Sequence, residues 1–346
     1  MSRKSATQPP KPDYSAVYTS PQYLVLEHGN SDDGSFIRSY IPLNPYHDAA
    51  GRLKVVVYLH GFCLGAAEIY QSHLIHLAQQ GYYVFFPSYQ RGFCRYSDSL
   101  PTTMGDLTRA LFRPFPISPQ GWFDNAIASV LGAYERAKLV DSPLDTYLFG
   151  HSLGGLFALS WPAFAHDKVP AELMPRQILT ANPIPDSESL IPTPIRIFGQ
   201  MTGAYADRVD IATTGGDILV PVAILHGLGD ILVPTNAWVR PFEAIASTEK
   251  RFYCSQNDSH GLPALVADHI QAGIDTSFIP NVMATMSVGG VASENTLDWR
   301  YIWHALDQVI RQGVRADQLQ FDMGTWSDGV PVQPIRSGTP QECGSK

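Results

Sequence analysis

Residues 150–154 read Gly-His-Ser-Leu-Gly, so that one serine stands between two glycines in a G-x-S-x-G pattern. A short apolar run at residues 146–149 suits a buried strand, and residues 153–165 suit a helix packed on a sheet. A tight turn from strand to helix would point the hydroxyl of Ser152 into solvent and leave free backbone N–H groups beside it. Glycines suit such a turn because a Cβ at either position would clash. We therefore predict that Ser152 is a catalytic nucleophile rather than an ordinary exposed serine.

A serine hydroxyl is a poor nucleophile at neutral pH, so it needs a base that is oriented by an acid. After a turn of this kind the expected order along the chain is serine, acid, histidine. Asp230 follows the apolar run at residues 222–225, and His260 follows the run at residues 251–254. In α/β sheets, ligands gather at the carboxyl ends of the strands. We predict that Ser152, Asp230 and His260 form a catalytic triad.

Other residues could fill these roles. Asp186, which follows an apolar run at residues 177–181, is the second candidate for the acid, whereas Asp258 is too close to His260 to support it from behind. His151 flanks the serine and is expected mainly to pack inside the turn. The remaining histidines that we considered lie on an expected helix or in no motif: His73, His76, His269 and His304.

Acyl transfer also requires hydrogen-bond donors for the oxyanion that forms at the carbonyl carbon. The backbone N–H of Leu153, at the start of the expected helix, is one predicted donor. The second should come from the loop after residues 53–59, where the chain continues His60-Gly61-Phe62. We predict that the N–H of Phe62 faces the pocket while His60 holds the loop. The residues expected to contact substrate are Phe62, Cys63, Leu64 and His151.

Aromatic and aliphatic side chains suggest the polarity of the substrate. Some of them could line an apolar pocket, which favours uncharged, moderately apolar esters, although ordinary core positions are an equal alternative. These side chains are Phe62, Leu64, Phe93, Phe112 and Phe115.

The order of apolar runs and helical patterns is strand, helix, strand, helix. This order predicts a mostly parallel central sheet with helices on both faces, led by two antiparallel strands. The expected strands are residues 23–26, 36–41, 53–59, 82–86, 146–149, 177–181, 222–225 and 251–254. The expected helices are residues 68–80, 124–138, 153–165, 235–246 and 296–310.

We find no internal repeat, and we predict a single domain over residues 21–328. A flexible segment, residues 1–20, is expected before it, and a tail rich in Pro, Gly and Ser, residues 329–346, is expected to fray. Long irregular segments inside a compact domain are usually functional loops. Residues 183–221 are therefore expected to form a lid or pocket wall, and residues 261–294 a further loop.

Composition excludes several classes of protein. The 346 residues include 24 Lys and Arg against 32 Asp and Glu, for a net charge of −8, so no basic stripe is available for nucleic acid. No apolar run is long enough to span a bilayer. The absence of an H-E-x-x-H motif or a His/Cys cluster predicts no metal, and the proposed chemistry predicts no cofactor. The partner is expected to be a small-molecule ester, and the sequence does not indicate an oligomeric state.

The expected compartment follows from the N-terminus and the cysteines. Residues 1–12 are polar and contain no apolar core of a secretory signal. The four cysteines are widely spaced and form no C-x-x-C pair, so reduced thiols in a cytoplasmic protein are expected. They are Cys63, Cys94, Cys254 and Cys343.

Over about residues 35–311, these motifs resemble the α/β-hydrolase fold family. The matching positions are His60-Gly61, the turn at residues 150–154, Asp230 and His260. The sequence is also similar to the dienelactone-hydrolase, chlorophyllase and cutinase-like branches. However, dienelactone hydrolases use cysteine where this chain has Ser152, and secreted polyester hydrolases usually bring a signal peptide and disulfides.

The resemblance implies a serine hydrolase that cleaves carboxylic esters through an acyl-enzyme intermediate. Several alternatives share the same triad: a lipase or cutinase-like polyester hydrolase, an acyltransferase, an amidase, or an enzyme of cofactor-free perhydrolysis. A binding protein without catalytic activity on the same scaffold is a further alternative. Product analysis with competing nucleophiles separates the reactions that share the triad.

Overall fold

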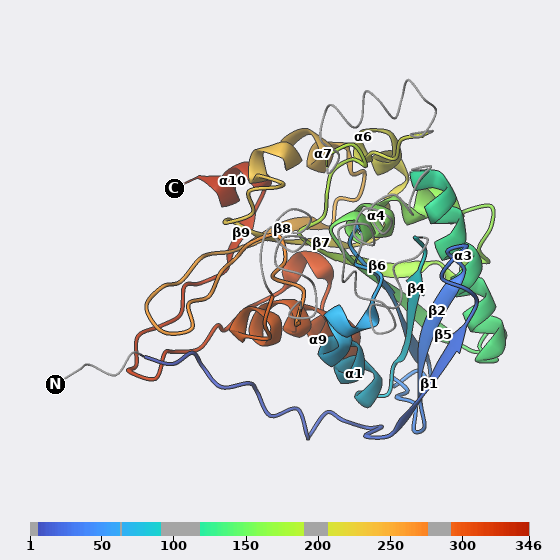
Figure 1. The fold of residues 1–346 in the computed structure, drawn as a ribbon, viewed down its shortest axis with the longest axis horizontal. Coiled ribbons are helices and arrows are strands. Elements are labelled where there is room, and N and C mark those ends of the chain that lie inside the picture. Colours follow the sequence, from blue (N-terminus) through green and yellow to red (C-terminus); the bar gives the residue numbers. More distant parts are fainter. Residues whose placement is uncertain (1–5, 63, 91–117, 190–206, 276–291, 346) are drawn as a thin grey trace, which may run out of the picture.

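The computed structural model describes residues 6–62, 64–90, 118–189, 207–275 and 292–345. Within these residues the strands form one sheet in the order β1-β2-β4-β3-β5-β6-β7-β8-β9 (Figure 1). The strands are β1 (Tyr23–His28), β2 (Phe36–Pro42), β3 (Leu53–Leu59), β4 (Tyr83–Ser88), β5 (Leu144–His151), β6 (Pro175–Ala181), β7 (Val222–Gly227), β8 (Lys250–Ser255) and β9 (Arg336–Gly338).

The helices that pack around this sheet differ widely in length. They are α1 (Gln71–Gln79), α3 (Pro119–Arg136), α4 (Leu153–Ala165), α6 (Ile211–Thr214), α7 (Val239–Ala244), α9 (His304–Arg311) and α10 (Pro340–Gly344). Short 3-10 helices lie at Ala67–Tyr70, Ala171–Leu173, Gly215–Asp217, Thr235–Trp238 and Ala316–Gln318, and a π-helix at Asp298–Trp303 precedes α9. In the described parts of the chain, no helix combines the length and the apolar character needed to cross a bilayer.

The six central strands, from β4 through β8, run parallel, whereas β1, β2 and β9 pair antiparallel at the edges. Alternate residues of each strand point to opposite faces, which gives two apolar cores. Val56 and Tyr58 of β3 pack with α1 and α9 on one face, and Val55 and Val57 pack with α3, α4 and α7 on the other (Figure 1). The predicted α/β arrangement is therefore confirmed.

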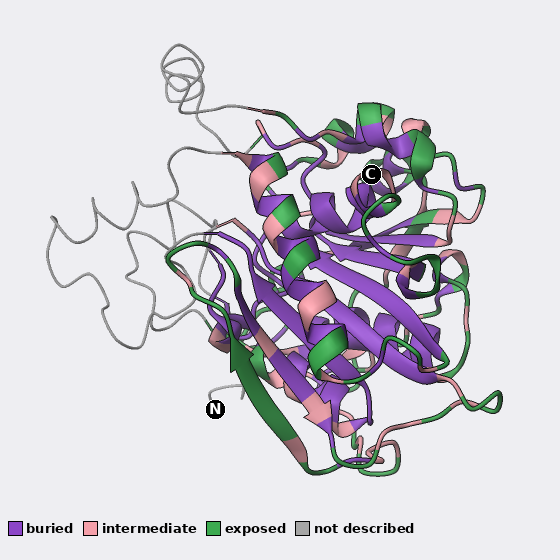
Figure 2. Cartoon of the chain, turned by 90° about the vertical axis from the view of Figure 1, so that its right-hand side faces the viewer, coloured by how far each residue is buried: buried purple, intermediate pink, exposed green. Residues whose placement is uncertain are grey.

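Burial explains the composition of the strands. All seven residues of β3 are buried, and the strand reads as a continuous apolar run with β-branched residues. Edge strand β1 is different, because five of its six residues are exposed, as Figure 2 shows along the border of the buried sheet. Its exposed side chains include Leu24, Val25 and Leu26.

The described residues at both ends of the chain contact distant parts of the protein. In the segment expected to be flexible, the Ala6 carbonyl accepts a hydrogen bond from the Leu262 N–H, and the Tyr14 hydroxyl donates to the Trp299 carbonyl. In the segment expected to fray, β9 extends the sheet and α10 follows it, so β8 is not the last strand. These contacts join residues far apart in the sequence, and local composition does not reveal them.

The two long segments set aside as loops are partly structured. In residues 183–221, the described ends pack into the core: Ile184 and Ile211 are buried, and the Pro183 carbonyl accepts a hydrogen bond from Trp238 Nε1. Residues 190–206 of the expected lid, and 276–291 of the second loop, lie outside the described residues.

Candidate active site

The turn between β5 and α4 holds Ser152 in a backbone conformation that is rare for any residue other than glycine, with φ 55° and ψ −117°. The neighbouring glycines make this turn possible. A Cβ on Gly150 would clash with the backbone of Gly154, and a Cβ on Gly154 would clash with the carbonyl of Leu59 at the end of β3. The turn thus has the strand-to-helix geometry that the sequence predicted.

Ser152 is hydrogen-bonded to a histidine that the sequence did not single out. His269 Nε2 lies 2.8 Å from Ser152 Oγ, and His269 Nδ1 lies 2.7 Å from Asp230 Oδ2. An ionised carboxylate only accepts hydrogen bonds, so Nδ1 carries the proton and Nε2 is left to accept one from the serine. The three side chains therefore form a continuous chain in which the imidazole is already oriented as a base.

The expectation that His260 is the base is wrong in this structure. His260 Nε2 lies 2.8 Å from Asp328 Oδ2 at the surface, and its side chain is 35% exposed. The residue also lies against the ring of Trp326, at a centroid distance of 5.9 Å. His269 occupies the position beside Ser152 instead.

The sequence contained a signal that distinguishes the two histidines. Both follow β8, so the order of the triad along the chain does not separate them. His260 stands among polar residues, beside Asp258, Ser259 and Gly261, whereas the stretch around His269 alternates with buried apolar residues. A base that shares a hydrogen bond with a buried serine must itself be buried, which favours the second setting. The apolar residues around His269 are Leu265, Ala267, Ile270 and Ala272.

Asp230 takes the predicted position of the acid. Its Oδ2 also accepts a hydrogen bond from Asn182 Nδ2 at 2.9 Å, and its Oδ1 accepts from the N–H groups of Leu232 and Val233, both at 2.9 Å. Burial acts to raise the pKa of this carboxyl, but the hydrogen bonds that it accepts, first that of His269 and then that of Asn182, help to hold the pKa below its usual value. Asp230 therefore stays ionised although it is 4% exposed.

The alternative acid, Asp186, is engaged elsewhere. Its Oδ1 accepts a hydrogen bond from the Glu188 N–H at 2.9 Å, and its Oδ2 accepts from Ser189 Oγ at 2.8 Å. These bonds turn its carboxylate to its own loop. The structure thus selects Asp230 of the two candidates.

A second layer of side chains supports Asp230. Asn182 follows β6 with φ 45°, and its Oδ1 accepts a hydrogen bond from Gln271 Nε2 at 2.6 Å. Ser255 Oγ, at the end of β8, donates to Gln271 Oε1 at 2.7 Å. The acid is therefore tied to the ends of two further strands and to the segment that carries the base. Nothing in the sequence pattern marked Asn182 or Gln271 for this role.

His151 connects the nucleophile turn to the base. Its Nε2 lies 2.8 Å from the His269 carbonyl oxygen and must donate to it, so Nδ1 accepts from the Tyr70 hydroxyl at 2.8 Å. The Tyr70 oxygen in turn accepts the Gly61 N–H at 3.1 Å. Burial lowers the pKa of His151 to about 3, so the ring is neutral. The residue is fully buried with both nitrogens engaged, so neither nitrogen is left for the predicted contact with substrate.

The two expected oxyanion donors belong to segments that lie next to the nucleophile. A Cβ on Gly61 would lie 3.3 Å from Ser152 Cβ, so the loop with Phe62 runs directly past the serine. Leu153 is the first residue of α4, where helix N–H groups lack partners within the helix. Neither the Phe62 nor the Leu153 N–H donates to an acceptor among the described residues.

His60 holds the loop that carries Phe62. Its Nδ1 lies 2.7 Å from the Gly61 carbonyl oxygen, and its ring stacks on Tyr89 at a centroid distance of 4.1 Å. Burial lowers the pKa of His60 to about 4, which keeps the ring neutral. The ring therefore has the packing and hydrogen bonding of a structural residue.

Ser152 and His269 are only 2% and 3% exposed in the described structure. Of the expected pocket residues, Phe62 is half-buried and Leu64 is buried. The others lie outside the described residues: Cys63, Phe93, Phe112 and Phe115.

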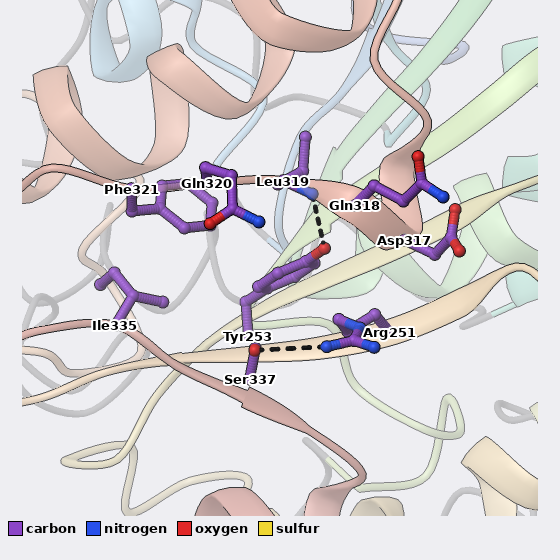
Figure 3. A pocket seen from close by; sticks show the side chains of 9 residues that line it. All are labelled: Arg251, Tyr253, Asp317, Gln318, Leu319, Gln320, Phe321, Ile335 and Ser337. Carbon is purple, nitrogen blue, oxygen red and sulfur yellow. Dashed lines mark hydrogen bonds between the residues drawn. The ribbon is translucent and has the colours of Figure 1, made fainter.

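A separate hollow of about 540 Å³ lies between β8, β9 and residues 317–321 (Figure 3). Its lining includes Arg251, Tyr253 and Phe321 but none of the three residues Ser152, Asp230 and His269. The Tyr253 hydroxyl accepts a hydrogen bond from the Leu319 N–H at 2.9 Å. Within the described ranges, no three His, Cys, Asp or Glu side chains are grouped as metal ligands.

Comparison with protein-family models and with curated proteins gives no match. Solved structures do match: the acylaminoacyl peptidase of Pyrococcus horikoshii superposes with a TM-score of 0.50 at 12% identity, over 87% of this chain and 43% of that chain. The chain has the α/β-hydrolase fold. TT1662 from Thermus thermophilus matches with a TM-score of 0.43 at 19% identity, over 67% of this chain and 89% of that chain. Esterase B from Lactobacillus rhamnosis matches with a TM-score of 0.45 at 13% identity, over 70% and 76%.

In this α/β-hydrolase fold, Gly154→Ala should disrupt the nucleophile turn. The added Cβ would meet the carbonyls of Leu59 and His60, which cannot move without displacing the end of β3. We expect a loss of about 2 kcal/mol in the free energy of unfolding, measured by urea denaturation. Gly216→Ala is the matched control, because nothing lies within 4 Å of a Cβ at that position. Equal stability of the two variants would contradict this account of the turn.

Asp268, beside the base, should make the stability of the protein depend on pH. Burial raises its pKa from 3.8 to about 6, so between these pH values the folded protein binds more protons than the unfolded chain. The free energy of unfolding should therefore fall as pH rises from 4 to 6. Asp268→Asn removes the titrating carboxyl and therefore this fall in the free energy of unfolding. The variant should be more stable than wild type at pH 7, but not at pH 4. Urea denaturation at both pH values measures the difference, and a difference independent of pH would exclude this origin.

Proposed function

We propose that this protein is a serine hydrolase that cleaves carboxylic esters through an acyl-enzyme intermediate. The observation that carries the proposal is the hydrogen-bonded chain from Ser152 Oγ through His269 to Asp230. Such a chain supplies what a serine lacks at neutral pH, a base within hydrogen-bond reach that is held in the correct tautomer by an acid. The strained turn at Ser152 is a second support, because strain of this kind is typical of functional positions.

In the first half of the reaction, Ser152 Oγ attacks the ester carbonyl carbon while His269 Nε2 accepts the hydroxyl proton. The N–H groups of Phe62 and Leu153 are the proposed donors to the oxyanion, and each such donor contributes about 3 kcal/mol to transition-state stabilisation. The imidazolium then donates its proton to the leaving alkoxide, the bond from carbon to oxygen breaks, and the acyl group remains on Ser152.

In the second half, His269 accepts a proton from water as the water oxygen attacks the acyl carbon. The same proton returns to Ser152 Oγ when the carboxylic acid leaves. Asp230 remains ionised throughout and stabilises the imidazolium in both halves. Four hydrogen bonds to the Asp230 carboxylate support that role, because they hold it in place. The proposed mechanism uses only side chains, backbone N–H groups and water.

The proposed substrates are apolar esters. Large apolar side chains are exposed in the segments that carry the acid and the base: Ile231, next to Asp230, is 84% exposed, and Val266, just before His269, is 51% exposed. We expect these loops to contribute to an apolar substrate site, because ligand sites are lined mainly by apolar side chains. A lipase or polyester hydrolase that acts at an interface is the second candidate, and the same observation favours it.

Ester hydrolysis should depend on Ser152. We expect the purified protein to hydrolyse p-nitrophenyl esters and to be labelled by a fluorophosphonate probe, and we expect Ser152→Ala to lose both properties while it remains folded. Within an acetate-to-palmitate series, kcat/KM should rise by up to about fourfold per methylene until the acyl site is filled. Retained hydrolysis by Ser152→Ala would refute the proposal, and a preference for emulsified over dissolved substrate would favour the lipase alternative.

The two candidate bases can be distinguished by a matched pair of variants. His269→Ala removes the partner of Ser152 and should lower kcat at least about 1,000-fold. His260→Ala removes only exposed contacts, with Asp328 and with the ring of Trp326, so kcat should stay within about twofold and the free energy of unfolding should change by about 0.5 kcal/mol. The reverse ranking of kcat would show that the base is His260. Circular dichroism of both variants provides the control for folding.

A further inference from the structure

Two cysteines that the proposed reaction does not use lie together where the C-terminal segment meets the sheet. β9 pairs antiparallel with β8, and Arg336 stands opposite Cys254 in the register. After β9 the chain turns into α10, which carries Cys343 (Figure 1). Cys343 Sγ lies 3.7 Å from the Phe252 carbonyl oxygen and 3.8 Å from that of Arg336. Its sulfur is therefore placed over the stretch of β8 that contains Cys254.

The thiols of Cys254 and Cys343 are neighbours in one apolar environment. They are 0% and 1% exposed, both are free, and both belong to the core on the α4 and α7 side of the sheet. Phe252 and Cys254 point to this same face because they are two residues apart on a strand. Burial, with a further contribution from the Cys343 thiol in contact with it, raises the pKa of Cys254. Both thiols are thus shielded from solvent while α10 remains docked.

We propose that Cys254 and Cys343 form a disulfide under oxidising conditions, and that this bond fastens β9 and α10 to the central sheet. Two observations support the pairing: Arg336 stands opposite Cys254 in the register, and Cys343 Sγ lies against the carbonyls of Phe252 and Arg336. The bond would close the chain between residues 254 and 343, a loop that contains the base His269. A crosslink that closes a long loop lowers mainly the conformational entropy of the unfolded chain, and it thereby stabilises the folded protein.

The reaction requires a disulfide oxidant such as glutathione disulfide. Cys343 reacts first, because α10 is a short outer helix while Cys254 lies in a strand between β7 and β9. Its thiolate attacks one sulfur of glutathione disulfide and releases one glutathione. The thiolate of Cys254 then attacks the sulfur of Cys343 and releases the second. Two protein thiols are oxidised to one disulfide, and glutathione disulfide is reduced to two glutathione molecules.

The segment formed by β9 and α10 borders the loop that carries Asp230. A cavity of about 710 Å³ separates them, lined by Asp230 and Thr235 on one side and by Arg336 and Pro340 on the other. Beside the cavity, the end of α10 packs against Thr235, since a Cβ on Gly344 would lie 3.6 Å from the Thr235 side chain. Oxidation would therefore restrain one flank of the Asp230 loop without contact with the reacting atoms.

The test is refolding of the full-length protein from urea in glutathione buffers of graded redox ratio, since refolding exposes both thiols to the oxidant. Free thiols are then blocked with N-ethylmaleimide, and the digest is analysed by mass spectrometry. We expect a linked peptide that joins Cys254 to Cys343 and that dithiothreitol removes. Recovery of both residues as alkylated thiols at every ratio, or linkage to Cys63 or Cys94 instead, would overturn the proposal.

Thermal unfolding tests whether the bond fastens the segment. Oxidised wild type should show a Tm about 5 °C above that of the reduced protein. Cys343→Ser, which cannot form the bond, should show no such shift between the same two buffers. A linked peptide without a rise in Tm would overturn the fastening role. The peptide analysis uses wild type alone, so the test remains decisive even where the serine variant folds poorly.

Discussion

The backbone conformation of Ser152 is the constraint on which the rest of the site depends. For a residue with a side chain, this backbone conformation is unfavourable by a free energy on the order of 1–3 kcal/mol, and it persists only where the surrounding structure fixes it. Here the Ser152 N–H donates to the Ala181 carbonyl at the end of β6, and the Ser152 carbonyl accepts from Gly155 and Leu156 of α4 and from Ile184. The sheet and the helix thus hold the turn from both sides.

A buried negative charge is the second constraint, and it sets the direction of every hydrogen bond in the triad. Asp230 is kept ionised by donors on both of its oxygens, two of them backbone N–H groups in its own loop. Because an ionised Asp230 cannot donate, His269 must present its N–H to the acid and its lone pair to the serine. The tautomer of the base therefore follows from the burial and the hydrogen bonds of the acid.

The parts that could be predicted from the sequence are those specified by neighbouring residues. The turn at Ser152 needs glycines two positions away, and Asp230 needs only a strand that ends a few residues before it, so both could be identified from the local pattern. His269 follows no strand directly. The apolar residues around it indicate a buried setting, but its role arises from contacts with residues distant in the chain. The same reason explains the ends of the chain, where residues 6–20 and β9 are ordered by contacts that composition does not encode.

The base lies in a segment without regular secondary structure, and this is compatible with catalysis because buried hydrogen bonds replace those of a helix or strand. The His269 carbonyl is held by His151, its imidazole by Asp230, and the chain soon afterwards by the Ile274 N–H that donates to the Ile69 carbonyl. His151 also binds the Tyr70 hydroxyl, which accepts from Gly61 in the loop of the proposed oxyanion donor. One buried tyrosine–histidine pair therefore joins three segments through direct hydrogen bonds: the turn at Ser152, the segment of His269 and the loop of the proposed oxyanion donor Phe62.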